Sequence, residues 1–525
     1  MGSLSGEELT LSDLGDLDHP DEIGRVELTP EYADILSYGD HRVRLKTPVG
    51  GFLWYMPDRP LEVQVIASAE PADDATPVAS FPVPHGSMLV KVGASLLAAV
   101  ENRYGEPTSI TIYDLADPHQ PLQVGRLVTE DVPYLPTWVQ RGQVRPAIHA
   151  IGNALVLVHQ RQHDVLDESV MGTVCYTSLT QDVPCAGQVG CTYAAGEQTC
   201  HDYGEGTLFC TGGFARCTDH GDGESTCEAR AASELEGAVP NTRCEPASPS
   251  RSWRQLELFV VDLSDPAAPA LVDSIPMPPE HEAMSVLAHG SDFYVSTRVP
   301  VVVPGNPRPY AAYYLTRVGL SDPAQPAVAS AVNVPGDLLA VHEGRLLMRH
   351  PRWGQQFIET ALAQIRIIDG YVSLQRYHRF DDRSVGNVVV DDTGLMAAQH
   401  SNVWRRPWYD PSGAFDDKLT LMRITRTLPP MHAGILGFDV LSENALERRP
   451  EPYLLAGQRL LLRLYGGLAV IDVSDPAAPV ARAFFQAKGA LSHFALDNRE
   501  LLIAAGQYGV LQLDLDADNL LDATP

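Results

Sequence analysis

The sequence contains Val470-Ile471-Asp472-Val473-Ser474-Asp475-Pro476, followed by Pro479, and close copies of this phrase occur three more times. Each copy joins an apolar, β-branched run to Asp-Pro and then to a second proline three residues later. The other copies begin at Ile112, Val260 and Arg317, and their second prolines are Pro121, Pro269 and Pro326. A phrase that recurs in this way within one chain indicates a repeated structural unit.

The chemistry of the phrase is that of a turn between two strands. The β-branched run favours a strand, and an aspartate before proline accepts hydrogen bonds from nearby amides while proline ends the strand pairing. The second proline begins the next strand, where a missing amide is tolerated at the edge of a sheet. We therefore interpret the repeated aspartates as turn-forming residues rather than as catalytic groups.

Two further strands precede each phrase. Residues 148–158, for example, have the pattern of a strand, a tight turn and a second strand, and residues 339–348 repeat it. Four antiparallel strands that recur about every 40 to 50 residues are typical of a β-propeller. We therefore expect an all-β protein, a β-propeller over residues 16–516, with eight four-stranded blades and seven as the alternative. Residues 16–28 resemble an outer strand, so we expect this N-terminal strand to complete the last blade and close the ring.

All eight cysteines lie in one short part of the chain. They are Cys175, Cys185, Cys191, Cys200, Cys210, Cys217, Cys227 and Cys244. An even number in such a segment indicates disulfides made in an oxidising compartment, whereas a zinc site would need close C-x-x-C pairs that are missing here. The spacing leaves the pairing open. We expect residues 164–253 to be a cysteine-rich insertion between the second and third strands of blade 3.

The aromatic residues of this insertion are expected to form its small core, with a contact surface as the alternative. They are Tyr176, Tyr193, Tyr203, Phe209 and Phe214.

The stretch over residues 470–480 resembles the LVIVD repeat of bacterial surface and secreted proteins. The whole chain, apart from the insertion, is also similar to exported bacterial proteins with a β-propeller domain. This resemblance implies the propeller fold and an extracellular, periplasmic or outer-surface location. It implies little about activity, because one fold supports many functions.

The net charge of −29, from 67 acidic and 38 basic residues, limits the classes of partner. An acidic surface repels phosphate backbones, so we expect no nucleic-acid partner. No apolar run approaches the roughly 20 residues of a membrane helix, so we expect no transmembrane segment. We interpret residues 1–15 as a tag and linker on a chain whose export signal was removed, with a lipid anchor on the preceding segment as one candidate. Residues 517–525 have the composition of an acidic tail.

Propellers commonly bind ligands at the mouth of the central channel, where the second strands end and the first strands begin. Arginine, histidine and tyrosine at these positions of an acidic chain point to an anionic or sugar-like ligand, or to a metal held by histidines. The candidate ligand-binding residues are His159, Arg161, Arg298, Arg349, His350, His400, Tyr465, Tyr508, His281 and His493. The alternative is that these groups pair with loop backbone and with one another.

Asp514, Asp516 and Asp518 have the alternate spacing of a calcium loop. The stretch lacks the glycine and the terminal glutamate of that loop, so a frayed acidic tail is the alternative. No cofactor is expected to be required, and calcium is the one metal candidate.

Two functional hypotheses follow. The first is an exported surface or secreted binding or scaffold protein that contacts a protein or glycan at the cell surface through the channel mouth and the insertion. The second is an exported hydrolase or lyase of a carbohydrate or another anionic substrate, with a His/Arg/Tyr site at the mouth. The sequence lacks a nucleophile elbow, an H-E-x-x-H motif, a P-loop and a haem-attachment motif, which favours the first.

Overall fold

The fold is described from a computed structural model of the 525-residue chain. The described residues are 2–4, 8–13, 21–27, 31–47, 60–69, 75–135, 138–140, 143–145, 147–166, 172–202, 209–221, 224–235, 241–247, 250–303, 306–353, 358–380, 384–401, 417–423, 439–446, 451–456, 458–464, 467–486, 493–497, 500–504 and 510–514. The chain forms two compact units, one made of Met1–Arg161 with Gln255–Pro525 and the other of Gln162–Arg254.

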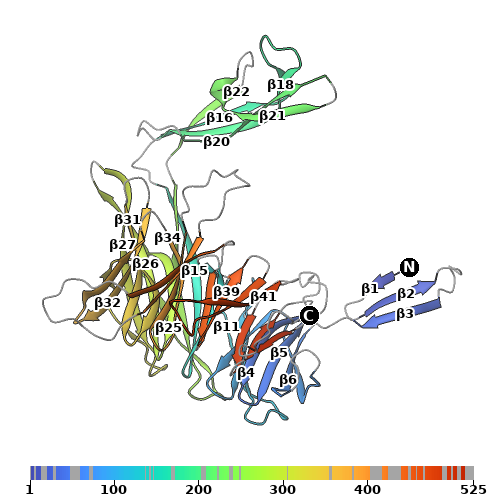
Figure 1. Ribbon diagram of the computed structural model, residues 1–525, viewed down its shortest axis with the longest axis vertical. Helices are drawn as coiled ribbons and strands as arrows, with labels where there is room; N and C mark the ends of the chain where they lie inside the picture. Colours follow the sequence, from blue (N-terminus) through green and yellow to red (C-terminus); the bar gives the residue numbers. More distant parts are fainter. Residues whose placement is uncertain are drawn as a thin grey trace. The chain divides into compact units, whose positions relative to one another are not determined.

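Within the described residues, the first unit contains eight main antiparallel sheets that follow one another along the chain, together with a three-stranded sheet near the N-terminus and a two-stranded hairpin. Within each sheet the strands lie side by side in chain order, so most sheets have a narrow range of colour in Figure 1, whereas the third sheet combines strands from before and after the insertion. Within the described residues the only helical element of the chain is a 3-10 turn, Ala232–Glu234. The all-β prediction is therefore confirmed.

The sheets have the following strands. The first has β4 (Glu31–Tyr38), β5 (His41–Thr47), β6 (Leu61–Ala67) and β7 (Ala79–Val83), and the second has β8 (Ser87–Val92), β9 (Leu96–Glu101), β10 (Thr108–Asp114) and β11 (Leu122–Thr129). The third has β14 (Ile148–Ile151), β15 (Ala154–Leu166), β23 (Ser250–Asp262) and β24 (Ala270–Pro276). The fourth has β25 (Glu282–His289), β26 (Asp292–Val303), β27 (Asn306–Gly319), β28 (Ala327–Val328) and β29 (Val332–Val334).

The remaining sheets keep the same order. The fifth has β30 (Asp337–His342), β31 (Arg345–Trp353), β32 (Ile358–Ile368) and β33 (Tyr371–Arg379), and the sixth has β34 (Ser384–Val390), β35 (Leu395–Ser401), β36 (Asp417–Arg423) and β37 (Asp439–Leu446). The seventh has β38 (Glu451–Ala456), β39 (Arg459–Leu464), β40 (Gly467–Asp472) and β41 (Val480–Gln486), and the eighth has β42 (His493–Asp497), β43 (Glu500–Ala504) and β44 (Val510–Asp514). A short hairpin of β12 (Trp138–Gln140) and β13 (Gln143–Arg145) lies between the second and third sheets in the sequence.

The repeated aspartates shape the turns between third and fourth strands, as predicted. Asp472 accepts a hydrogen bond from the Ser474 amide at 2.9 Å, and Asp475 accepts one from the Ala477 amide at 3.0 Å. The same contacts to the amide two residues on are made by Asp114, Asp117, Asp262, Asp265 and Asp322. Each carboxylate thus accepts a hydrogen bond from a backbone amide in the turn, where pairing with the neighbouring strand has ended. This is the chemistry of an Asx turn.

Buried apolar clusters join each sheet to the next from the first sheet to the seventh. Between the second and third sheets, for example, Ile110 and Ile112 pack with Leu155 and Phe259. A further cluster joins the first sheet to the eighth, through Ile35 and Leu502. Among the described residues, apolar side chains therefore pack between consecutive sheets from the first to the seventh, and between the first sheet and the eighth.

One glycine marks how closely neighbouring sheets approach. A Cβ atom at Gly125 in β11 would lie 2.0 Å from the carbonyl oxygen of Pro266, which belongs to the Asp-Pro turn of the next sheet. Only glycine leaves room for the backbone of one sheet against the turn of another.

The N-terminal strand differs from the expectation. Strand β3 (Asp21–Glu27) pairs with β2 (Glu8–Asp13), which pairs with β1 (Gly2–Leu4), and these three form a sheet of their own. The prediction that it completes the last sheet was therefore wrong, and part of the expected linker over residues 1–15 is strand. The physical reason is that β2 gives the backbone groups of β3 hydrogen-bonding partners nearby in the chain, so β3 needs none from β44.

The second unit is a smaller β structure whose labelled strands are β16, β18, β20, β21 and β22 in Figure 1. Its strands are β16 (Gly172–Leu179), β17 (Val183–Pro184), β18 (Cys191–Tyr193), β19 (Gly196–Asp202), β20 (Phe209–Asp219), β21 (Ser225–Arg230) and β22 (Asn241–Ala247). Their pairing order is β17-β18-β20-β19-β16-β22, with β21 also on β20. The unit spans Gln162–Arg254, against the sequence-based limits of 164 and 253, and strands β15 and β23 of the third sheet flank it in the chain.

Four disulfides link all eight cysteines of the second unit. They are Cys175–Cys244, Cys185–Cys191, Cys200–Cys210 and Cys217–Cys227. The disulfide prediction is confirmed, and the structure adds the pairing. Tyr193 and Phe214 are 1% and 2% exposed and form the core with Leu179 and two of the cysteines, so these two aromatics are core residues.

Candidate functional site

Polar side chains form a row at one end of the fourth sheet. Strand pairing places Glu282 opposite Arg298, and Arg298 opposite Tyr313. Residues directly opposed in antiparallel strands point to the same face, so the three side chains lie together. Arg298 donates from Nε and one terminal nitrogen to the two carboxylate oxygens of Glu282, at 2.8 and 3.0 Å. This two-point geometry is the strongest form of an arginine–carboxylate pair.

Asp337 connects this row to the next two sheets. It is 2% exposed, and its two carboxylate oxygens accept hydrogen bonds from the Ser285 hydroxyl at 2.5 Å and from Arg349 at 3.1 Å. Arg349 also donates to the carbonyl oxygen of Val385 at 3.4 Å. Ser285 lies in the fourth sheet, Asp337 and Arg349 in the fifth and Val385 in the sixth, so the pair of Asp337 and Arg349 links three successive sheets.

Burial and charge in this network make Tyr313 and Arg298 hydrogen-bond donors and not bases that abstract a proton. Burial raises the pKa of the Tyr313 phenol, although the charges of Arg298 and Arg349 oppose that rise. The hydrogen bonds to Glu282 raise the pKa of Arg298 further. Tyr313 therefore stays protonated and Arg298 stays charged at neutral pH, and both arginines already have carboxylate partners.

The predicted histidines have separate partners. His281 bonds to the Thr297 hydroxyl at 2.9 Å, His400 to the Thr420 hydroxyl at 2.6 Å and His159 to the carbonyl oxygen of Tyr134 at 3.2 Å. His350 contacts the Tyr377 ring edge-on, with centroids 5.8 Å apart, and Arg161 is exposed in β15.

Burial lowers the pKa of both His159 and His281, so these two rings are neutral at pH 7. In the part of the chain that the structure describes, no group of three or more His, Cys, Asp or Glu side chains could hold a metal.

Several predicted residues lie outside the described part of the chain. Tyr465, Tyr508, Asp516 and Asp518 are among them. His493 begins β42 and Asp514 ends β44, but the description covers only their backbone. The calcium site therefore stays a prediction.

Sequence reasoning placed Arg298, Arg349 and His281 among the candidates, but it missed the carboxylate that binds Arg349, the serine bonded to that carboxylate and the tyrosine opposite Arg298. Asp337, Ser285 and Tyr313 had no motif to distinguish them from other polar residues. The one available signal for Asp337 was its place after Pro335 and Gly336, where a strand begins after a turn.

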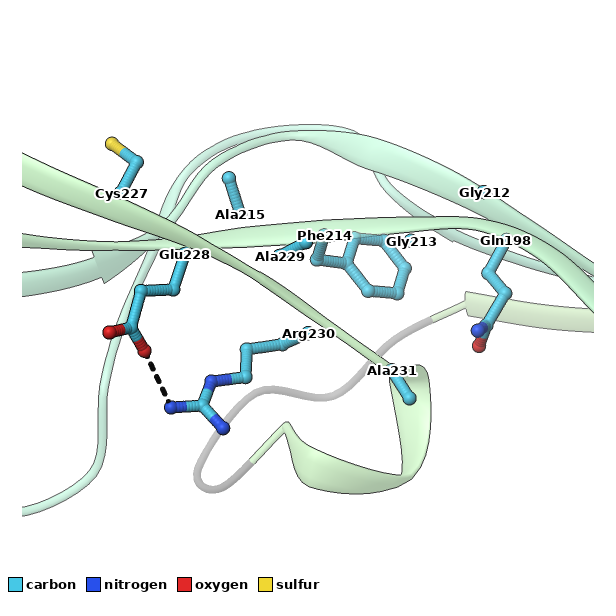
Figure 2. Close-up of a pocket in the computed structure, with 10 residues that line it drawn as sticks. All are labelled: Gln198, Gly212, Gly213, Phe214, Ala215, Cys227, Glu228, Ala229, Arg230 and Ala231. Atoms are coloured by element: carbon cyan, nitrogen blue, oxygen red, sulfur yellow. Dashed lines mark hydrogen bonds and ion pairs between the residues drawn. The ribbon is translucent and has the colours of Figure 1, made fainter. Parts of the chain in front are cut away.

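The second unit has a pocket of about 480 Å³ lined by residues of β20 and β21 together with Gln198 and Ala231. Figure 2 shows the Arg230 guanidinium turned toward the Glu228 carboxylate, at a distance of 2.8 Å. Glu234 lies 3.3 Å from another nitrogen of Arg230, so two carboxylates meet one guanidinium beside the pocket. The floor includes Gly212, Gly213 and three alanines, which leave backbone accessible to a ligand.

The fold and these sites define a repeat protein of antiparallel four-stranded sheets with a disulfide-linked second unit. The LVIVD repeat family matches it at residues 254–276 and 465–483. These segments cover the third strand, the Asp-Pro turn and the fourth strand of the third and seventh sheets. The chain thus contains LVIVD repeats at two places, and such repeats form β-propeller-like structures. No curated protein matches the chain.

No helix within the described residues has the length and apolarity that crossing a membrane requires.

Proposed function

We propose that this protein is an exported binding protein, in which a β-propeller supports a disulfide-linked contact unit. The propeller is supported by the eight consecutive sheets, by the packing of the first sheet on the eighth and by the LVIVD repeats. Export is supported by the four disulfides, because such bonds persist in oxidising compartments. The compartment is then extracellular, periplasmic or the outer cell surface.

The main observation that supports this proposal is the exposed surface of the second unit. It has its own core around Tyr193 and Phe214, so its exposed strands are free to serve recognition. Most side chains of β21 and β22 are exposed, and a pocket opens beside Arg230. Small disulfide-linked units with few apolar residues commonly hold recognition surfaces in place by their bridges.

The partner is a protein or glycan at the cell surface. Arg230, Glu228 and Gln198 supply both hydrogen-bond donors and acceptors at the pocket, which suits hydroxyl and amide groups. The net charge of −29 excludes polyanions as the preferred class of partner.

The test is deletion of residues 170–248 and their replacement by a short Gly-Ser linker. The deleted and full-length chains are labelled and compared for binding to intact cells and to a glycan array, with thermal unfolding as the control for folding. We expect unchanged unfolding of the remaining chain and at least a tenfold loss of binding. Equal binding by the two chains would show that the contact surface lies elsewhere.

An exported hydrolase or lyase is the second candidate. The observation in its favour is the position of Tyr313 opposite Arg298, because the charges of Arg298 and Arg349 oppose the rise in the pKa of this phenol, and a phenol can donate a proton to a leaving group. The observation against it is that both arginines are paired with carboxylates. Incubation with neutral and acidic polysaccharides, followed by assay of new reducing ends, tests it, and Tyr313→Phe is the variant that should remove any activity found.

A further inference from the structure

The fourth sheet has an interrupted outer strand. In the second sheet the corresponding strand, β11, has eight residues, and in the fifth sheet β33 has nine. In the fourth sheet it is divided into β28, which pairs with Val318 and Gly319, and β29, which pairs with Tyr313 to Leu315. The chain between the two pieces is Ala329-Ser330-Ala331, whose small side chains fill little space.

A pocket of about 370 Å³ lies beside this interruption, between residues of the fourth and fifth sheets. Leu315, Val332, Leu346 and Ile367 supply apolar surface, and Ala329 and Ser330 line it as well. Leu315 and Leu346 belong to the cluster that joins the two sheets, so the walls are held by the packing of the core. The volume falls within the range of small-molecule sites, which are mostly apolar with a few polar groups.

Among the described residues that line the pocket, Arg317 is the one with a basic side chain. Its side chain is 59% exposed, and its guanidinium lies 3.8 Å from the Asp292 carboxylate, a distance too long for a hydrogen bond. Asp292 in turn accepts a hydrogen bond from the Tyr294 hydroxyl at 3.4 Å. The donors of Arg317 are therefore oriented beside an apolar cavity, with one neighbouring carboxylate that competes for them.

We propose that this pocket binds a small amphipathic anion, with its apolar body between the fourth and fifth sheets and its anionic group at Arg317. The local positive charge of Arg317 attracts the anionic group, against the general repulsion from a chain of net charge −29. The site is separate from the second unit, and it does not depend on the function proposed above.

The probe is 8-anilinonaphthalene-1-sulfonate, with the uncharged N-phenyl-1-naphthylamine as its matched control, and the measurement is fluorescence titration of the full chain. We expect one saturable site for the sulfonate. Arg317→Gln should weaken sulfonate binding about fivefold, since a screened ion pair is lost, and should leave the uncharged probe unchanged. Asp292→Asn removes the competing carboxylate and should tighten sulfonate binding about threefold.

A second pair of variants tests the location. Ser330 is exposed at the pocket, so Ser330→Trp should fill it without disturbing the core and should abolish binding of both probes. Ser264→Trp is the control, because Ser264 is an exposed serine in the Asp-Pro turn of the third sheet. Thermal unfolding verifies that each variant is folded.

Three results would overturn the proposal. They are sulfonate binding that survives Ser330→Trp, equal effects of Arg317→Gln on the charged and uncharged probes, and many weak sites in place of one saturable site. Weaker binding to Asp292→Asn would contradict the assigned position of the anionic group.

Discussion

Asp337 and Glu282 each accept hydrogen bonds from an arginine, but they differ in burial. The Asp337 side chain is 2% exposed and the Glu282 side chain is 28% exposed. Removing one partner of a buried ion pair leaves the other charge uncompensated, whereas exposed pairs contribute little because water screens them.

We therefore expect Asp337→Ala to lower the free energy of unfolding by about 3 kcal/mol, against less than about 1 kcal/mol for Glu282→Ala. Urea unfolding of both variants measures the difference. Equal losses would mean that Asp337 does not hold the three sheets together.

Asp472 provides a pH dependence that can be measured. Burial would raise the pKa of its carboxyl, but the hydrogen bonds from the Ser474 amide and Arg482, with the charge of Arg459, hold that pKa well below its usual range. A lowered folded-state pKa stabilises the fold above the unfolded pKa of about 4, and that stability is lost as pH falls toward the folded value.

Asp472→Asn should thus lose about 2 kcal/mol of unfolding free energy at pH 7, and the difference from the unchanged chain should shrink below about pH 4. Asp475→Asn is the matched control in the same turn, because Asp475 is exposed and caps the Ala477 amide. The measurement is urea unfolding from pH 3 to 7, and a gap that stays constant with pH would refute the assignment.

At the scale of the elements, the pairing between the third and fourth strands has the same irregularity in the second, third and seventh sheets. Their register shifts by one residue between Ile112 and Tyr113, and again between Val260 and Val261 and between Val470 and Ile471. These are the same positions of the repeated phrase. The extra residue lies in the fourth strand, at Val124, Val272 and Arg482, so the strand that follows the Asp-Pro turn bends there.

The disulfides of the second unit differ in the length of chain that they close. Cys175–Cys244 spans 69 residues, whereas Cys200–Cys210 spans 10. Because the entropy lost by the unfolded chain grows with loop length, replacing both cysteines of the longer bridge by alanine should cost about 1.5 kcal/mol more.

Hydrogen exchange of β16 and β22, followed by mass spectrometry, measures the loss of stability in the two variants, each of which lacks both cysteines of one bridge. We expect faster exchange in the second unit and unchanged exchange in the eighth sheet. Equal exchange in the two variants would show that loop length does not determine their stability.

At the scale of the whole first unit, the contact between the first and eighth sheets joins residues at opposite ends of the chain. Leu502 packs with Tyr32, Ile35 and Ile66, and all four are at most 1% exposed. Arg42, 1% exposed, donates hydrogen bonds to Glu500 and Gln512 across the same contact.

We expect Leu502→Ala to cost about 3 kcal/mol and to speed hydrogen exchange in residues 31–47 as well as in the eighth sheet. Leu460→Ala, which removes the same side chain from the cluster of the sixth and seventh sheets, should leave residues 31–47 protected. Exchange that rises only in residues 493–514 would show that the eighth sheet does not stabilise the first.

The sequence by itself determined the strands, the turns and the disulfide-linked insertion. These features depend on residues close together in the chain: β-branched runs, aspartate before proline, and cysteines concentrated between Cys175 and Cys244. Local chemistry of this kind is readable without knowing which segments meet.

The tertiary structure alone decided which groups meet. The link from Ser285 to Asp337, the disulfide pairing and the contact of Leu502 with Ile35 all join residues whose proximity no spacing rule encodes. The pocket beside Arg317 has the same origin, because it forms where small residues interrupt a strand against a neighbouring sheet. Packing determines such contacts, since each depends on the shape of the surrounding core and not on the residue alone.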